Sequence, residues 1–323
     1  MGRGPGLPPR LSPRLSQGGS LQTSQQLFDR WRSDLSGWGI PEAILAAAPE
    51  GPWVFPRSVF AGRARRQVID RAGPSYRRAV EALPVGGSVI DVGSGAGAAS
   101  LPLAGRASRI TAIDTDPAML SSLTAIAAGL GAEGDKTPEA PLKAPDKTPE
   151  APLKAPDKTE VVTVVGRWPD VADRVPVADV VVCHHVLYNV MELLPFVEAL
   201  SDHARVRVVV EMTERHPVEP MNPLWMRFHG LERPEGPTWE DAVAAISSLG
   251  HDVHVERWDA APLHTYESFD EMVAYHRRRL CLPSSADPEV AVALKDLGVD
   301  PDNPVGLGRG RPVMTLWWAG TGA

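Results

Sequence analysis

The distribution of apolar residues along the chain predicts alternating strands and helices. Short apolar runs rich in Val and Ile and bounded by glycine, proline or polar residues indicate strands. Segments in which apolar residues recur every three or four positions indicate helices with one buried face. Strands are expected at about residues 88–92, 109–114, 160–165, 178–184, 205–212, 251–258 and 312–318. Helices are expected at about residues 21–36, 41–48, 59–83 with a break near Gly73, 117–130, 192–204, 222–230, 238–249 and 268–282.

Two segments fit neither pattern. Residues 1–20 are rich in Gly, Pro, Arg and Ser, which predicts a disordered tail, with a basic arm for nucleic acid as the alternative. The sequence Asp-Lys-Thr-Pro-Glu-Ala-Pro-Leu-Lys-Ala-Pro fills 135–145 and recurs at 146–156. Its prolines exclude a helix, because each removes a backbone donor. We expect a solvated, polyproline-like insertion at about 132–159 that does not divide the domain.

Composition sets broad limits on function. Apolar residues make up 43% of the chain and charged residues 23%, as in ordinary globular proteins. The net charge of −7 argues against bulk attraction to a polyanion. The only two cysteines, Cys183 and Cys281, stand far apart and imply neither a disulfide framework nor a zinc cluster. With no apolar run long enough to span a bilayer and no secretory signal, we expect a cytoplasmic protein without a membrane partner.

A glycine-rich turn follows the first expected strand. The run Val89-Ile90 ends at Asp91, and glycines occupy the alternate positions 93, 95 and 97. Glycine lets a ligand approach the backbone closely because no Cβ is in the way. A helix starting after the turn would add free N–H groups and partial positive charge. We therefore expect a strand, a tight turn that binds a ligand, and the start of a helix.

The spacing of the glycines bears on which cofactor binds. The turn can be aligned with a dinucleotide fingerprint as Gly93-x-Gly95-x-x-Ala98. Against this alignment, the third glycine follows the second by two residues instead of three, and Asp91 is placed to face a cationic or amino-bearing ligand. The next strand also ends in an acid, Asp114, which is placed to accept both hydroxyls of a ribose.

These two segments together resemble the class I S-adenosylmethionine-dependent methyltransferases. Asp91-Val92-Gly93-Ser94-Gly95-Ala96-Gly97 and Asp114-Thr115-Asp116-Pro117-Ala118-Met119-Leu120 match both halves of that family's signature. The resemblance implies S-adenosyl-L-methionine as the cofactor. It also implies an α/β fold with a seven-stranded, mostly parallel, Rossmann-like sheet, a reversed final hairpin and helices on both faces. The implied cofactor-binding residues are Asp91, Gly93, Ser94, Gly95, Gly97, Asp114, Thr115 and Trp168.

The assignment of Trp168 rests on the loop after the third strand, which lies along the adenine in this family. Many members have a small-acid pair there, and this chain has Arg167-Trp168 instead. The Trp168 ring can stack on the adenine or pack against a helix. Asp170 can supply the polar contact or cap the next helix.

The family also gives an expectation for the N-terminal helices, which commonly form a lid over the cofactor. We assign residues 21–84 to a helical lid and 85–323 to the methyltransferase domain. Trp31, Trp53 and Phe55 are lid candidates, and packing onto the sheet is an equal alternative.

The carboxyl ends of the fourth and fifth strands carry the candidate catalytic residues. Ligands of open α/β sheets bind at these ends. His184 and His185, and His216 after the fifth strand, are candidate bases, because histidine can take a proton near neutral pH. The alternative is that they hold the turns by hydrogen bonds. No Asn-Pro-Pro-Tyr motif follows the fourth strand, which disfavours amino acceptors recognised through that motif. No metal site is expected.

Three functions remain open at this stage. The first is methyl transfer by in-line displacement to an O or N atom of a small molecule. The second is an RNA or protein methyltransferase that docks substrate on the arginine-rich stretch 57–83, although stacking aromatics are few there. The third is a non-catalytic, cofactor-binding scaffold.

Overall fold

The computed structural model describes residues 23–53, 57–132, 158–259, 266–307, 310 and 312–323. The expected tail at 1–20, Phe55 and most of the repeat insertion lie outside the described residues.

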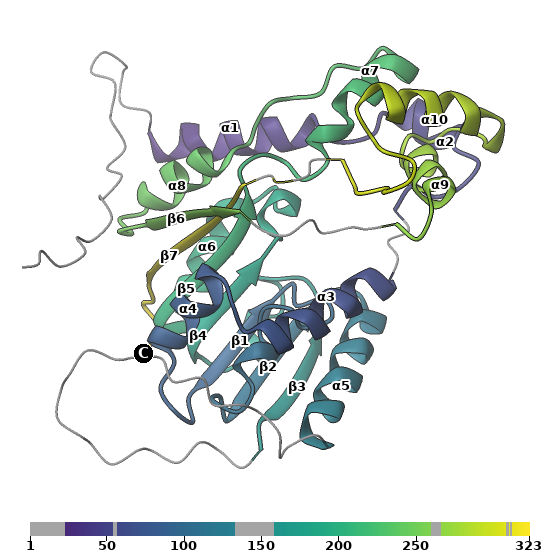
Figure 1. Ribbon diagram of the computed structural model, residues 1–323. Coiled ribbons are helices and arrows are strands. Elements are labelled where there is room, and N and C mark those ends of the chain that lie inside the picture. Colours follow the sequence, from purple (N-terminus) through teal and green to yellow (C-terminus); the bar gives the residue numbers. More distant parts are fainter. Residues whose placement is uncertain (1–22, 54–56, 133–157, 260–265, 308–309, 311) are drawn as a thin grey trace, which may run out of the picture.

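A single sheet of seven strands forms the centre of the molecule, in the order β3-β2-β1-β4-β5-β7-β6 (Figure 1). Strands β1 to β5 pair in parallel, whereas β7 runs antiparallel to both of its neighbours, β5 and β6. This confirms the predicted seven-stranded, mostly parallel sheet with a reversed final strand. The strands are β1 (Ser88–Val92), β2 (Arg109–Asp114), β3 (Glu160–Val165), β4 (Ala178–His184), β5 (Ala204–Thr213), β6 (His254–Asp259) and β7 (Pro312–Ala319).

Helices cover both faces of this sheet, as expected. Successive side chains of a strand point to opposite faces. In β4, Val180 and Val182 pack in the cluster that contains α4, whereas Val181 and Cys183 pack in the cluster that contains α1 and α6. One face bears α3 (Arg57–Asp70), α4 (Pro74–Ala82) and α5 (Pro117–Ala132), and the other bears α1 (Ser24–Ser36), α6 (Leu193–Asp202) and α8 (Trp239–Ser247).

The N-terminal helices are divided between these layers. The indole of Trp31 in α1 is 1% exposed and donates to the carbonyl of Val190 at 2.8 Å, in the core of one face. Ala79 and Ala82 of α4 pack on the opposite face. For Trp31 the structure therefore supports packing, and residues 21–84 do not form one layer. A lid remains a prediction, and α3 is the helix that packs on the glycine turn.

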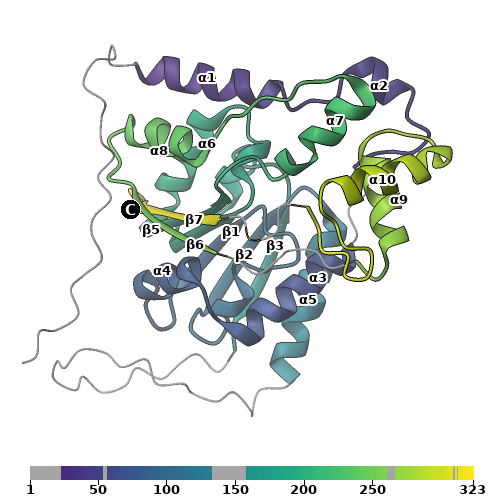
Figure 2. The same ribbon diagram turned by 45° about the horizontal axis from the view of Figure 1, so that its top comes forward.

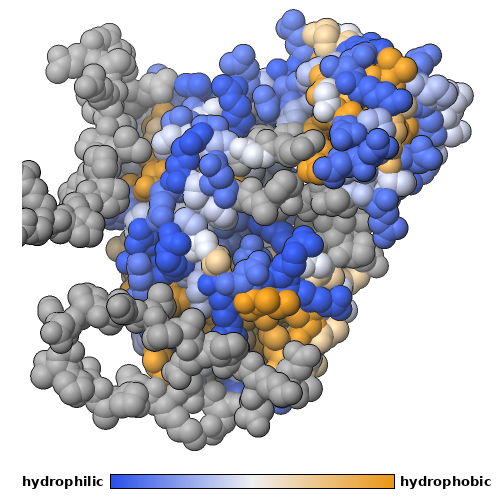
Figure 3. Space-filling view, in the orientation of Figure 1, coloured by the Kyte–Doolittle hydropathy of each residue, from blue (hydrophilic) through white to orange (hydrophobic). Residues whose placement is uncertain are grey.

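A smaller helical layer, the cap, lies beyond the carboxyl edge of the sheet. It has its own apolar cluster, which includes Leu224, Met272 and Leu294. The sequence pattern did not predict its last helix, α10 (Asp287–Asp296). Figure 2 shows its members gathered with α2 (Glu42–Ala46), and Figure 3 shows apolar surface among them. The cap consists of α7 (Asn222–His229), α9 (Phe269–Arg279) and α10 (Asp287–Asp296).

Within the described part of the chain, no helix combines the length and apolar character required to cross a bilayer. Cys183 and Cys281 are both free and buried.

Truncation of Trp31 tests whether α1 is part of the core. We expect Trp31→Ala to lower the free energy of unfolding by about 3–5 kcal/mol, because it opens a cavity and leaves the Val190 carbonyl unpaired. Trp53 is 55% exposed beside the Arg279 guanidinium, so Trp53→Ala is the control and should cost less than about 1 kcal/mol. Urea unfolding measures both, and equal losses would contradict the assignment of α1 to the core.

Candidate functional site

The turn after β1 requires glycine at two of its three glycine positions. Gly93 has φ +68°, and a Cβ there would lie 2.4 Å from Cγ2 of Val186. Gly97 has φ +89°, and its Cβ would lie 2.7 Å from Cγ of Leu101. Gly95 has φ +51°, but no described atom lies within 4 Å of a Cβ placed on it. The backbone at Gly95 is therefore open to a close ligand.

The helix expected directly after this turn is absent from the described structure. Residues 95–100 form consecutive turns that lead into a short 3₁₀ helix, η1 (Leu101–Leu103). Pro102 has no N–H to extend a helix. Instead, α3 packs on the turn, with Ala64 and Val68 in one cluster with Leu101. The prediction of a helix start here was wrong, so a bound ligand would meet turn N–H groups and no helix dipole.

Asp91 is buried beneath the turn. Its side chain is 1% exposed, and Oδ2 accepts a hydrogen bond from the Ser100 hydroxyl at 2.6 Å. Oδ1 has no hydrogen-bond partner among the described residues. Burial raises the pKa of Asp91 to about 7 against the hydrogen bond from Ser100, and the nearby Asp114 carboxylate adds to the rise. An amino group or cation would satisfy the free oxygen and favour ionisation.

Asp114 at the end of β2 is tied to the same turn. Its Oδ2 accepts the N–H of Gly95 at 2.8 Å, and its Oδ1 accepts the N–H of Asp116 at 2.9 Å. A carboxylate has about four lone-pair sites, so acceptor capacity remains for two ribose hydroxyls. Next to it, Ser94 has a buried hydroxyl without a partner among the described residues, and Thr115 is exposed.

Trp168, which follows β3, is buried. It is 5% exposed in the main core cluster, where its ring meets the ring of His203 edge-on, with centroids 4.9 Å apart. This placement supports packing and gives no support to stacking on an adenine.

The histidines that end β4 meet a buried carboxylate of β5. His185 Nε2 lies 2.9 Å from Glu211 Oε1, and His185 Nδ1 lies 2.7 Å from the Tyr188 hydroxyl. Because a carboxylate only accepts, Nε2 carries the ring proton and Tyr188 donates to Nδ1. Tyr188 in turn accepts the N–H of Thr213 at 3.1 Å. Both nitrogens of His185 are engaged, which supports the interpretation that its ring holds the turn, and its catalytic role stays a prediction.

Arg63 of α3 reaches the same carboxylate, with Nη2 3.1 Å from Glu211 Oε1. Burial opposes ionisation of Glu211, but His184, His185 and Arg63 hold the pKa of its carboxyl below the ordinary value. Burial lowers the pKa of His184 to about 4, and burial together with Arg63 lowers the pKa of His185. At neutral pH an ionised Glu211 thus lies between a guanidinium and two neutral imidazoles.

His216 is held differently. Its ring stacks on Trp38 with centroids 4.0 Å apart, and its Nδ1 accepts the N–H of Val218 at 3.4 Å. Its ring centroid lies 5.8 Å from that of Tyr188, and the Tyr188 hydroxyl bonds His185.

The structure therefore brings His184 and His185 together and adds two residues that sequence reasoning did not assign to the site. One of them, Glu211, had a visible signal, because it is an acid near the end of a buried strand, as Asp91 and Asp114 are. Arg63 lies 148 positions from Glu211 and had no such signal.

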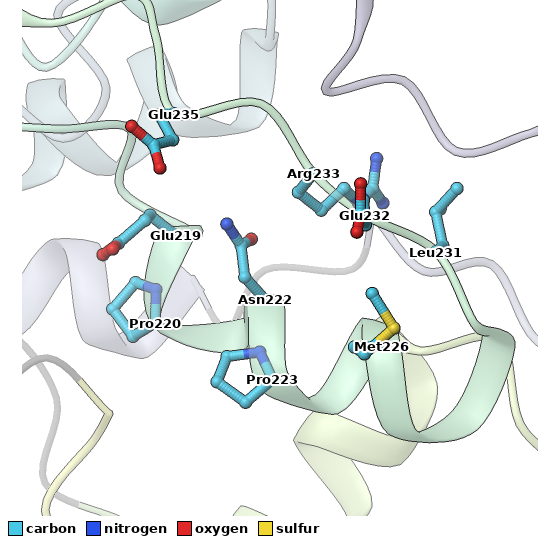
Figure 4. Close-up of a pocket in the computed structure, with 9 residues that line it drawn as sticks. All are labelled: Glu219, Pro220, Asn222, Pro223, Met226, Leu231, Glu232, Arg233 and Glu235. Atoms are coloured by element: carbon cyan, nitrogen blue, oxygen red, sulfur yellow. The ribbon is translucent and has the colours of Figure 1, made fainter.

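A cavity of about 600 Å³ has none of the histidines, Glu211 or the glycine turn in its lining. It lies along α7 and the segment 231–235, and Figure 4 shows Glu219, Glu232 and Glu235 on its walls. Among the residues that the structure describes, no cluster of His, Cys, Asp and Glu could hold a metal ion.

The glycine turn can be tested by adding single methyl groups. Gly93→Ala should lower the free energy of unfolding by about 2–5 kcal/mol, because the Cβ clashes with Val186 and the backbone is left-handed. Gly105 has φ +88° with open space around it, so Gly105→Ala should cost only about 1–2 kcal/mol for the backbone. Equal losses in urea unfolding would contradict a close Gly93–Val186 contact.

The buried carboxyl of Asp91 predicts a pH-dependent stability. Its pKa is raised from 3.8 to about 7, so its contribution is complete below pH 3.8 and is lost as the pH rises through 7. The loss in wild type relative to Asp91→Asn should approach about 4 kcal/mol between pH 4 and pH 8. Asp252→Asn, at a side chain 96% exposed, is the control. Parallel pH profiles of wild type and Asp91→Asn would refute the shift.

No protein-family model matches the chain, and no curated protein matches it. Similar solved structures include a magnesium protoporphyrin IX methyltransferase from Synechocystis with bound S-adenosylhomocysteine, at 13% identity over 90% of this chain and 93% of that chain, with a TM-score of 0.43. A cyclopropane-fatty-acyl-phospholipid synthase-like protein from Lactobacillus casei is 15% identical over 86% and 98%, with a TM-score of 0.47. An rRNA methylase from Streptococcus thermophilus is 11% identical over 76% and 94%, with a TM-score of 0.40.

The strand order, the antiparallel β7 and the glycine turn after β1 are features of this chain itself. This seven-stranded α/β topology is the fold that the resemblance to the class I methyltransferases predicts.

Proposed function

We propose that this protein is an S-adenosylmethionine-dependent methyltransferase that acts on an O or N atom of a small molecule. The observation that supports this most is the bond between the Gly95 N–H and the Asp114 carboxylate, which joins the glycine turn to the acid of the next strand. The open backbone at Gly95 and the unpartnered buried oxygens of Asp91 and Ser94 fit a ligand with both hydroxyl and amino groups.

Each residue of the turn has a distinct role in this proposal. Asp114 accepts the ribose hydroxyls, and Asp91 faces the amino group of the methionyl part. Gly93 and Gly97 keep the turn compact, and Gly95 leaves room for the ligand. When bound, the cofactor supplies an electrophilic methyl group on a sulfonium, and much of the rate enhancement can come from alignment with the acceptor.

The pairing of three of the seven arginines in the stretch 57–83 favours a small acceptor over RNA. Arg63 is paired with Glu211, and Arg77 and Arg78 are paired with Glu256 at 2.9 and 2.8 Å. Charges neutralised in this way contribute little to phosphate binding.

Calorimetric titration with S-adenosylmethionine, S-adenosylhomocysteine and NAD tests the cofactor. We expect the first two to bind wild type and Asp114→Asn to lower their affinity about 10–100-fold, because a bidentate charged acceptor is lost. Asp116→Asn is the matched control, because asparagine can replace Asp116 as the acceptor for the Ala118 N–H at the start of α5. Binding of NAD alone, or of none of the three, would refute the proposal.

A further inference from the structure

A small cavity lies between the α3–α4 segment and the carboxyl ends of β4 and β5. Its volume is about 20 Å³, enough for one water-sized group. Arg63, His184 and Glu211 line it, together with Ser75 and Trp258. The cavity thus contains the charged centre of the site and has room for one polar group.

Two nitrogens of residues that line this cavity have no hydrogen-bond partner among the described residues. They are the buried Nε of Arg63 and the buried Nε2 of His184. Buried polar atoms are normally paired, so two exceptions at one small cavity indicate a group that the described residues do not supply. The cavity also lies at the edge of the sheet where ligands of this architecture bind.

The protonation of the two nitrogens follows from Glu211. Its Oε1 accepts hydrogen bonds from Arg63 and His185, whereas its Oε2 faces Nδ1 of His184 at 3.8 Å. A proton on Nδ1 is attracted to this carboxylate, which leaves the lone pair of His184 on Nε2. The Nε of Arg63 always carries a hydrogen. The pair therefore offers one donor and one acceptor.

We propose that this cavity takes the hydroxyl group of the methyl acceptor, so that the acceptor is an alcohol or a phenol; the proposal rests on the methyltransferase function above. A hydroxyl both accepts and donates, and so complements Arg63 Nε–H and His184 Nε2 together. An ammonium group only donates, and a neutral amine that accepted a hydrogen bond from Arg63 would use the single lone pair that must attack the methyl group, whereas a hydroxyl oxygen keeps a second lone pair. A carboxylate only accepts and would face the His184 lone pair and Glu211.

In this arrangement His184 is the catalytic base and Glu211 a positioning residue. The hydroxyl proton passes to His184 Nε2 as the O–H bond breaks. The oxygen forms a bond to the methyl carbon while the carbon–sulfur bond of the donor breaks, and that electron pair stays on sulfur. The products are a methyl ether, a neutral thioether and a protonated His184. Arg63 stabilises the negative charge that develops on the oxygen.

The protonation pattern can be measured without knowing the acceptor. We expect nitrogen chemical shifts of the full chain labelled in histidine, at neutral pH, to show Nε2 of His184 unprotonated and Nδ1 protonated, with or without S-adenosylhomocysteine. Glu211→Gln should mix the two tautomers of His184. Glu214→Gln should leave them unchanged, because Glu214 lies at the same strand end but pairs with Arg257. A protonated Nε2 in wild type would overturn the proposal.

The acceptor class is tested with S-adenosylmethionine and aromatic acceptors of one skeleton that carry a hydroxyl, an amine or a carboxylate. Methyl ethers should be the products detected by mass spectrometry, and N-methyl or ester products without ethers would overturn the proposal. With a hydroxyl acceptor, His184→Gln should lower kcat about 10²–10⁴-fold. Glu211→Gln should lower kcat with little change in KM, unlike Glu214→Gln. If no acceptor reacts, the tautomer of His184 still tests the proposal, because a protonated Nε2 would overturn it.

The two proposals can fail separately. Loss of cofactor binding in calorimetry would refute the methyltransferase function and leave the His184 tautomer as measured. A protonated Nε2 with normal cofactor binding would refute the hydroxyl assignment alone.

Discussion

The buried carboxylate of Glu211 is the constraint on which the arrangement of the site depends. Removal of an ion from water costs several kcal/mol unless partners compensate for it. The partners come from two other elements: Arg63 from α3 and the histidines from the end of β4. A change in the placement of α3 or of the β4 turn would leave the charge unpaired, so this carboxylate fixes both elements relative to β5.

Helix α3 also packs on the glycine turn, which lacks the α-helix expected directly after it. Class I signatures lead one to expect a helix directly after the turn, and this chain has only η1 there. Ala64 and Val68 of α3 cover the apolar side of the turn and bury it in one cluster with Leu101 and Leu123. A segment that precedes β1 in the sequence thus packs against η1 and α5.

Local pattern predicted the sheet well because buried parallel strands are short Val- and Ile-rich runs, and β1 to β5 and β7 lie close to their expected positions. It predicted the glycine turn because left-handed backbone demands glycine there. It failed where the surroundings of a residue are set by residues far away in the sequence. The Arg63–Glu211 bond spans 148 positions, and Trp168 packs edge-on against His203, 35 positions away. The helix α10 was missed although its buried residues Val290, Ala293 and Leu294 have the three- and four-residue spacing of a helical face.

Helix α3 can couple ligand binding at the glycine turn to ligand binding at the cavity beside Glu211. It contacts the glycine turn through Ala64 and Val68 and the Glu211 carboxylate through Arg63. If a ligand at the turn biases the position of this helix, it also changes the affinity of the cavity beside His184 for its own ligand. Linkage makes that coupling reciprocal. The donor and the acceptor would then change each other's affinity by one common factor, set by a helix with two contact points.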